Sequence, residues 1–227
     1  KLSSITGLLE KVLHDPACLK RLIADFSINV TEMFRNPMFF CHFREKVIPI
    51  LRTYPSIRVW HAGCASGEEV YSMAILLYEE GLYDKTKIYA TDINPNTLKV
   101  AKMGQYSIEH MKKYTNNYIQ SGGQKAFSDY YSVKDNAVKF HSYLTKNVIF
   151  AQHNLVTDRS FNEFHVIFCR NVLIYFNKPL QKKVHELFYE SLGMFGILGL
   201  GETETIDYTE KEGCYEVIAA GQKLFRK

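Results

Sequence analysis

The sequence predicts an α/β fold whose sheet is mixed, mostly parallel and covered by helices on both faces. From Arg58 onward, short apolar segments alternate with longer segments of helical periodicity, which is the pattern of β-α-β units. The first apolar segment ends in a turn with two glycines, Gly63 and Gly67, that leads directly into a helix. Near the end of the chain, Tyr215–Ile218 and Lys223–Phe225 have the pattern of an antiparallel hairpin, which makes the sheet mixed.

The elements follow in order along the chain. Apolar residues recur at helical spacing over Leu2–Phe26, and Asp15 followed by Pro16 marks the start of a second helix in that stretch. Pro37 starts a further helix that runs toward Leu51. The expected strands are Arg58–His61, Lys87–Thr91, Asn147–Ala151, Phe164–Cys169 and Met194–Leu200, and the expected helices among them are Glu68–Glu80, Asn94–Met103 and Leu180–Leu192.

The chain is expected to divide near residue 53. Residues 1–53 would form an N-terminal helical region and linker, short or truncated, and residues 54–227 the sheet domain. Within that domain, about residues 105–146 are too long for a plain crossover and lack a clean helical period. Two short apolar segments around Asp135 and Asn136 predict a hairpin there, so the stretch is expected to be a small inserted antiparallel β-subdomain.

Bulk composition limits the class of function. The chain has 227 residues, 46% of them apolar, which is enough for a core without disulfide or metal. A net charge of +4 without a dense basic patch weighs against nucleic acid as a partner. Five cysteines without a C-x-x-C pair, together with the lack of a signal peptide or a membrane-length apolar run, favour a cytoplasmic protein without membrane insertion. His61 and Cys64 lack further partners at metal-binding spacing, so no metal site is expected.

The glycine turn and the acids around it predict a nucleoside-containing ligand. Glycine lets the backbone approach a ligand closely, and the next strand ends in Asp92, an acid suited to ribose hydroxyls. The nicotinamide pattern G-x-G-x-x-G is absent, and Glu68 and Glu69 in the first helical turn would repel a diphosphate. The two acids would suit a cationic ligand, such as the amino group and sulfonium of S-adenosylmethionine (SAM). In the alternative interpretation they are ordinary first-turn acids favoured by the helix dipole.

Two polar pairs that follow strands are candidates for the same site. Asn154 and Leu155 would place an amide near the adenine edge with leucine on its face, or the asparagine simply forms a turn. Arg170 and Asn171 interrupt an otherwise apolar run after the fourth strand. A charge in such a place faces a site or pairs with an acid in a structural salt bridge.

Arg35 is a candidate for contact with a carboxylate. It ends the segment Asn29–Arg35, which precedes the sheet domain. Its guanidinium is suited to orient a carboxylate through two parallel hydrogen bonds, while the segment could equally cap the helix that follows Pro37.

Several separated segments resemble the CheR family, the chemotaxis receptor glutamate O-methyltransferases. They match in order over most of the chain, and the string from Cys169 to Phe176 is the most specific. The matching segments are Asn29–Arg35, Trp60–Ser72, Ala90–Ile93, Asn154–Leu155 and Phe168–Phe176. The resemblance implies a Rossmann-like class I SAM-dependent methyltransferase fold. It also implies methyl transfer from SAM to glutamate carboxylates of a chemotaxis receptor in sensory adaptation, with S-adenosylhomocysteine (SAH) as product.

The resemblance also assigns roles to residues. The implied SAM contacts are Asn29, Thr31, Arg35, Glu68, Asp92, Asn154, Leu155, Arg170 and Asn171, and the glycine turn adds Gly63. Arg35 and Tyr175 are expected to orient the acceptor carboxylate. A glutamate is ionised at neutral pH, so the enzyme's part is positioning and desolvation, without a general base. The alternative is a non-enzymatic SAM-binding module of the same fold, with a regulatory or scaffold role.

The expected partner is the cytoplasmic helical region of a chemotaxis receptor, and the protein is expected to be a monomer. The resemblance implies that the inserted β-subdomain contacts the receptor. In some family members this subdomain binds a peptide at the receptor's C-terminus, helped by a glycine in a hairpin turn. The turn Lys134–Ala137 has no glycine, so a receptor pentapeptide tether is not expected. The chain departs from the family's usual residues at Met33, Ala65, Ser66, His165, Leu200 and Gly201.

Overall fold

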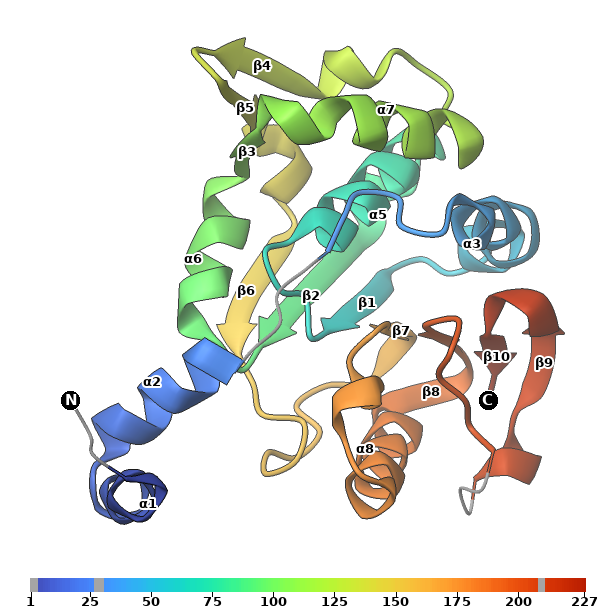
Figure 1. Ribbon diagram of the computed structural model, residues 1–227. Coiled ribbons are helices and arrows are strands. Elements are labelled where there is room, and N and C mark those ends of the chain that lie inside the picture. Colours follow the sequence, from blue (N-terminus) through green and yellow to red (C-terminus); the bar gives the residue numbers. More distant parts are fainter. Residues whose placement is uncertain (1–3, 27–30, 208–210) are drawn as a thin grey trace.

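The structure, a computed structural model, describes residues 4–26, 31–207 and 211–227 (Figure 1). Among these residues, seven strands form the main sheet in the order β6-β2-β1-β7-β8-β10-β9. Neighbours from β6 to β8 run parallel, and β10 runs antiparallel to both β8 and β9. The strands are β1 (Ile57–Ala62), β2 (Thr86–Asp92), β6 (Val148–Gln152), β7 (Phe164–Cys169), β8 (Leu192–Leu200), β9 (Glu216–Ala219) and β10 (Leu224–Arg226). The expected mixed, mostly parallel sheet with a terminal hairpin is confirmed.

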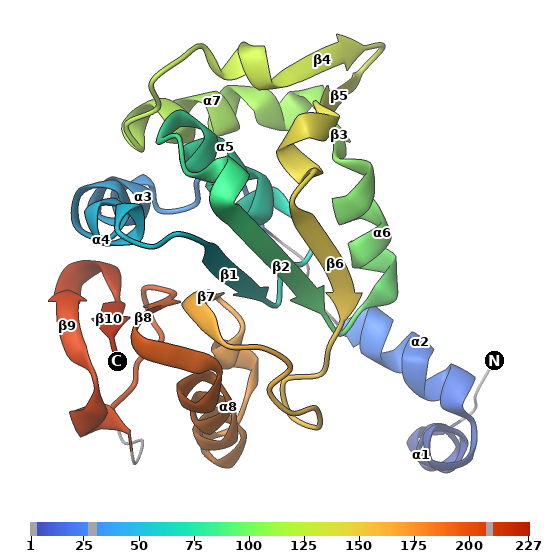
Figure 2. The ribbon, with the colours of Figure 1, turned by 180° about the vertical axis from the view of Figure 1, so that it is seen from behind.

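Alternate residues of each central strand enter two different cores, because successive side chains of a strand point to opposite faces. On β1, Val59 joins the core with α5 (Glu68–Glu79) and Trp60 joins the core with α8 (Lys178–Ser191). α6 (Pro95–Met103) packs by Leu98 on the same side as α5. Helices therefore cover both faces, as Figures 1 and 2 show from opposite sides.

The helix expected after Pro37 forms, with an irregular middle. It consists of α3 (Pro37–His42), a π-helical turn (Phe43–Val47) and α4 (Ile48–Arg52). Pro49 has no N–H to donate, and its ring would collide with the carbonyl one regular turn earlier, which accounts for the wider turn there. Phe39, Phe40 and Phe43 of this helix lie in the sheet core, so the helix packs directly on the sheet. The division near residue 53 stays a prediction.

The insertion contains the expected hairpin and also a helix that the sequence interpretation missed. β3 (Gln105–Ser107), β5 (Ala137–Phe140) and β4 (Tyr131–Lys134) form a three-stranded antiparallel sheet. α7 (Met111–Gln120) lies between β3 and β4. The expectation that this stretch has no helical period was therefore wrong. Met111, Tyr114 and Tyr118 are buried at spacings of three and four, a helical stripe hidden among polar residues.

The two N-terminal helices form where they were expected, as α1 (Ile5–His14) and α2 (Pro16–Phe26). The Asp15 carboxylate accepts a hydrogen bond of 2.9 Å from the Ala17 amide, which fixes the junction. Both helices project from the sheet domain, and α2 ends beside the carboxyl ends of β2 and β6 in both views (Figures 1 and 2). The short 3₁₀ helices are Tyr83–Lys85, Ile108–His110, Phe127–Tyr130, Ser142–Thr145, Leu173–Tyr175, Glu212–Cys214 and Ala220–Gln222.

Candidate active site

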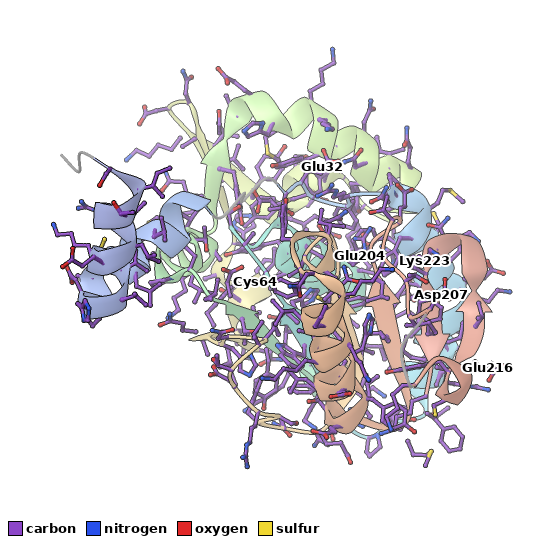
Figure 3. The ribbon with its side chains drawn as sticks, turned by 60° about the horizontal axis from the view of Figure 1, so that its bottom comes forward. Glu32, Cys64, Glu204, Asp207, Glu216 and Lys223 are labelled. Carbon is purple, nitrogen blue, oxygen red and sulfur yellow. The ribbon has the colours of Figure 1, made fainter. Side chains whose placement is uncertain are left out.

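The carboxyl ends of β1, β2, β6 and β7 meet at one edge of the sheet, where most of the predicted site residues lie. Strand order reverses between β1 and β7, and ligands of open α/β sheets bind at such a switch point. Figure 3 looks toward this edge, with Cys64 and Glu204 near the middle and Glu216 on the terminal hairpin. Figure 1 shows the end of α2 beside the carboxyl ends of β2 and β6.

The turn after β1 requires both of its glycines. Gly63 has φ +84°, and a Cβ on it would lie 2.5 Å from the Val172 Cγ2 atom. Gly67 has φ +95°, and a Cβ there would lie 2.8 Å from the Ala101 Cβ atom. The amides of Gly63 and Cys64 both donate to the Thr91 carbonyl, at 2.8 and 2.9 Å. The turn is therefore fixed to the end of β2, and only glycine allows the close approach of its neighbours.

Asp92 holds the same turn from the end of β2. One carboxylate oxygen accepts a 2.8 Å hydrogen bond from the Ala65 amide, and the other accepts a 2.9 Å bond from the Asn94 amide. Burial raises the pKa of Asp92, against the effect of these amides. Hydrogen bonds from the Ile93 amide and the Thr97 side chain also act to lower the Asp92 pKa, so four protein donors surround this carboxylate.

Glu68 is a buried carboxylate at the start of α5, with 6% of its surface exposed. Ser66 donates a 2.7 Å hydrogen bond to it, and the Tyr114 hydroxyl of the insertion faces it. Burial nevertheless raises the Glu68 pKa to about 7. Burial and the charges of the Asp92, Glu69 and Glu68 carboxylates raise the pKa of Cys64. A cationic ligand would balance the charge of Glu68.

Glu69 has protein partners, which corrects the idea that both first-turn glutamates face a ligand. It pairs with His61 Nδ1 and with Arg170 Nη1, each at 2.9 Å. Burial works to raise its pKa, but the His61 hydrogen bond and the Arg170 charge outweigh burial and lower it. Of the two acids at the helix start, only Glu68 forms no ion pair with a described residue.

Arg170 forms the structural ion pair that was the alternative interpretation of its charge. Its side chain is 2% exposed and lies over the Phe39 ring, 4.1 Å from the centroid. Besides Glu69, it donates to the Arg35 carbonyl at 3.0 Å and to Asn36 Oδ1 at 3.1 Å. Direct contact of Arg170 with SAM stays a prediction, and the structure gives it a role in holding the segment that carries Arg35.

The segment before α3 reaches this edge from outside the sheet. Thr31 and Arg35 are partly exposed, while Met33 and Phe34 are fully buried between them. The segment is thus anchored by its middle, which leaves Thr31 and Arg35 at the surface of the edge. Asn29 lies outside the described residues.

Glu204 is a site residue that the sequence interpretation missed. It is 4% exposed and accepts backbone hydrogen bonds of 2.6 to 2.9 Å from Gly201, Asn171, Val172 and Leu173. These bonds fix the loop after β7 and allow φ +61° at Asn171. Nothing in the local sequence distinguishes Glu204 from its neighbour Glu202, because three of the four partners belong to a loop some thirty residues away.

The remaining predicted residues differ in exposure. Tyr175 is 54% exposed, and no feature of the structure tests whether it orients an acceptor. Asn154 forms a turn, since its Oδ1 atom accepts a 2.9 Å hydrogen bond from the Val156 amide. Leu155 is buried in the core with α8. Contacts of these three with SAM or substrate stay predictions.

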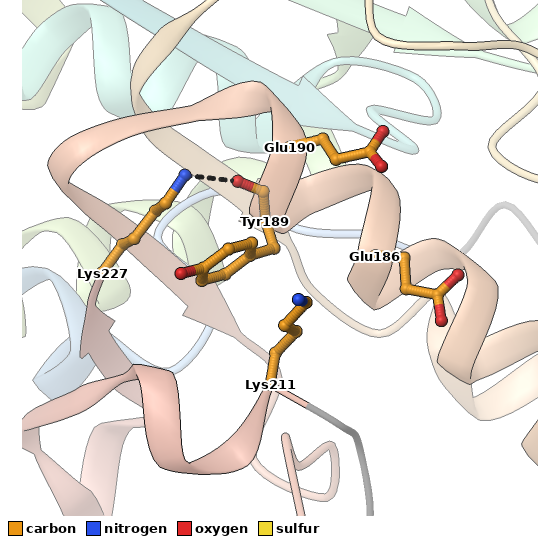
Figure 4. A pocket seen from close by; sticks show the side chains of 5 residues that line it. All are labelled: Glu186, Tyr189, Glu190, Lys211 and Lys227. Carbon is orange, nitrogen blue, oxygen red and sulfur yellow. Dashed lines mark hydrogen bonds between the residues drawn. The ribbon is translucent and has the colours of Figure 1, made fainter.

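A separate hollow of about 370 Å³ lies between α8 and the C-terminal segment (Figure 4). Glu186, Tyr189, Glu190, Lys211 and Lys227 line it, and Lys227 donates a 2.7 Å hydrogen bond to the Tyr189 carbonyl. None of the residues predicted for the site lines it. Among the described residues, no cluster of three or more His, Cys, Asp and Glu side chains is arranged to bind a metal, and no helix is long and apolar enough to span a membrane.

Comparison with known proteins decides the family. A family model described as "CheR methyltransferase, SAM binding domain" matches residues 29–220. The chain belongs to the CheR methyltransferase family. "Putative methyltransferase Cher3" of Pseudomonas putida is 49% identical over 224 residues, which are 99% of this chain and 82% of that protein. "Chemotaxis protein methyltransferase" of Listeria innocua is 34% identical over 194 residues, 85% of this chain and 71% of that protein.

As a CheR-family protein, the chain has a class I SAM-dependent methyltransferase fold and binds SAM. Among solved structures, PKMT2 from Rickettsia typhi in complex with AdoHcy matches at 14% identity with a TM-score of 0.41, over 71% of this chain and 25% of that one. The sheet edge fits SAM, because Glu68 is a buried carboxylate that forms no ion pair with a described residue, and Asp92 is a second buried carboxylate bonded to the same glycine turn. When bound, SAM supplies a methyl group on a positively charged sulfur.

Proposed function

We propose that this CheR-family methyltransferase methylates glutamate side-chain carboxylates of a chemotaxis receptor, producing glutamyl methyl esters. The proposal rests on the position of Arg35. Arg170 donates a hydrogen bond to the Arg35 carbonyl, which places Arg35 at the sheet edge that also holds Glu68 and Asp92. Relatives named as chemotaxis protein methyltransferases support the acceptor class. The cytoplasmic region of a receptor is the proposed partner, and the cytoplasm the proposed location.

In this proposal each site residue has a distinct part. Glu68 balances the positive charge of SAM, and Asp92 accepts from its ribose hydroxyls. Gly63 gives the backbone turn the space to approach the cofactor. Arg35 aligns the acceptor carboxylate through its guanidinium, with Tyr175 beside it. No general base is needed, because a glutamate with an ordinary pKa of about 4.3 is already ionised at neutral pH. The protein contributes orientation and removal of water.

The direct test is methyl transfer from radiolabelled SAM to membranes that contain a receptor of the same organism. A methyl ester releases volatile methanol in alkali, whereas N-methyl groups stay on the protein, so the product chemistry is read in the same assay. We expect Arg35→Ala to lower turnover by about a hundredfold, the worth of a bidentate charge-assisted pair. Arg52→Ala is the matched control, since Arg52 is 53% exposed and lies in α4, away from the edge.

Unchanged turnover in Arg35→Ala would remove that residue from the mechanism. If the wild-type protein binds SAH but transfers no methyl group to any receptor membrane, the proposal fails, and a regulatory SAM-binding module is the better description.

A receptor-tail tether is not part of the proposal. The β4–β5 turn has Asp135 at φ +54° and no glycine. Titration of a receptor C-terminal pentapeptide by calorimetry is expected to give no heat, and micromolar binding would contradict this.

A further inference from the structure

The segment from Met33 to Asn36 has a strained backbone beside the SAM site. Phe34 has φ +51° and Asn36 has φ +58°, in the left-handed region that side chains with a Cβ rarely adopt. Such a conformation persists only where surrounding contacts determine it, and it is often associated with function. The contacts that hold it therefore show which parts of the protein are built to shape this segment.

Three side chains from three elements bind three successive residues of the segment. Asn117 Nδ2 donates to the Met33 carbonyl at 2.9 Å. The Phe34 amide donates to Ser72 Oγ at 2.8 Å. Arg170 Nη2 donates to the Arg35 carbonyl at 3.0 Å. Ser72 belongs to α5 and Arg170 follows β7, so two of the three ties come from the sheet domain.

The third tie comes from α7, which belongs to the insertion. Asn117 lies on the face of α7 that also carries Lys113, paired with Glu32, and Tyr114, which faces Glu68. These three residues occupy adjacent turns of one helix, at spacings of one, three and four. One face of the insertion thus contacts both the strained segment and the buried carboxylate of the SAM site.

Aromatic packing reinforces the same connection. The Phe34 ring packs edge-on against Tyr118 of α7, with centroids 5.3 Å apart, and against Phe127 at 6.2 Å. Tyr118 and Tyr130 both donate to the Glu79 carboxylate of α5, which fixes the insertion to the sheet domain. The insertion is thereby held rigidly enough to position a neighbouring segment.

We propose that Asn117 is a positioning residue for methyl transfer, through which the insertion fixes the backbone that carries Arg35 at the SAM site. The role in transfer rests on the proposed function, while the effect on the SAM site does not. The insertion is then part of the active site, in addition to any contact it makes with a protein substrate.

The test compares Asn117→Ala with Asn116→Ala. Asn116 is the preceding residue of the same helix and is exposed, so the two variants share the same chemical change and the same gain in helix propensity. Calorimetry gives the dissociation constant for SAH, which requires no protein substrate. Urea unfolding measures the stability of both variants, and methyl transfer to receptor membranes gives kcat and KM.

We expect Asn117→Ala to weaken SAH binding by about fivefold, the worth of one net hydrogen bond, and to lower kcat as well. Asn116→Ala is expected to stay within about twofold of the wild type. Equal SAH affinity of Asn117→Ala and wild type would overturn the proposal, whatever the change in stability, because a purely structural residue alters unfolding alone. Equal weakening in both variants would overturn it too.

Failure of the proposed function is recognised separately. In that case the wild-type protein methylates no receptor, while the difference in SAH affinity between the two variants still decides the role of Asn117.

Discussion

Replacing Glu68 with glutamine removes a charge that the folded protein holds at a cost. The pKa of this carboxyl is about 7 in the folded protein and 4.5 when exposed, and burial is the main cause of the difference. A tenfold change in an ionisation equilibrium is worth about 1.4 kcal/mol, so ionised Glu68 destabilises the ligand-free protein by about 3 kcal/mol. Because the folded pKa is the higher one, protonated Glu68 leaves the free energy of unfolding at its full value well below pH 4.5. That free energy falls as the pH rises toward 7.

The assay is urea unfolding of wild type and Glu68→Gln at pH 5, 6, 7 and 8. Trp60 is the single tryptophan of the chain and is fully buried on β1, so its fluorescence reports the transition. The unfolding free energy of the variant, minus that of the wild type, is expected to rise by about 2.5 kcal/mol between pH 5 and pH 8. Glu202→Gln is the control, because Glu202 is exposed near the same edge.

SAH binding is expected to change in the opposite sense. At pH 8, Glu68→Gln loses the charge that balances the ligand's ammonium group, and affinity should fall by about ten- to a hundredfold. A stability difference that stays constant from pH 5 to pH 8 would refute the reasoning, since it would mean that Glu68 does not ionise in a buried place. Unchanged SAH affinity would refute its assignment to the cofactor.

Three further substitutions test the framework of the site. Glu204→Ala leaves four backbone amides without their acceptor and should lower the unfolding free energy by about 3 kcal/mol or more in urea; a loss under about 1 kcal/mol would contradict this. Gly63→Ala should lower the thermal midpoint, and Val172→Ala should restore part of it by removing the 2.5 Å contact; a lack of any recovery would exclude that contact as the cause. Glu69→Gln leaves the Arg170 charge unpaired and should lower the unfolding free energy by about 3 kcal/mol or more. The double variant with Arg170→Met should lose less unfolding free energy than the two single variants together. Additive losses would show that the pair does not interact.

The sequence predicted the positions of the site residues better than their roles. Asp92, Gly63 and Glu68 follow strands that run parallel, and parallel strands bring their carboxyl ends to one edge, so their proximity was predictable. Glu69 and Arg170 also follow strands of this sheet, where a contact with the ligand was equally expected. They instead form an ion pair with each other. Whether a charged side chain faces a ligand or another side chain depends on distances between segments about a hundred residues apart, which local patterns do not contain.

The insertion was only partly predictable from the sequence. The β4–β5 hairpin was predictable because its alternation is local, whereas α7 was not, because its buried stripe of one methionine and two tyrosines is visible only once the residues that cover it are known. Packing also brings Asn117 of this helix to the backbone beside Arg35, and Glu204 to the loop after β7.

The sequence by itself determined the order of strands and helices in the main sheet, the glycine turn and the acid after β2, because each depends on periodicity or backbone freedom within a few residues. It also carried the CheR segments, whose family the comparisons confirm. The tertiary structure alone decided how the charges are used: Glu68 is buried and bonded to Ser66, Glu69 and Arg170 neutralise each other, and Glu204 orders a loop. Burial and pairing set these roles, and both arise only when distant segments meet.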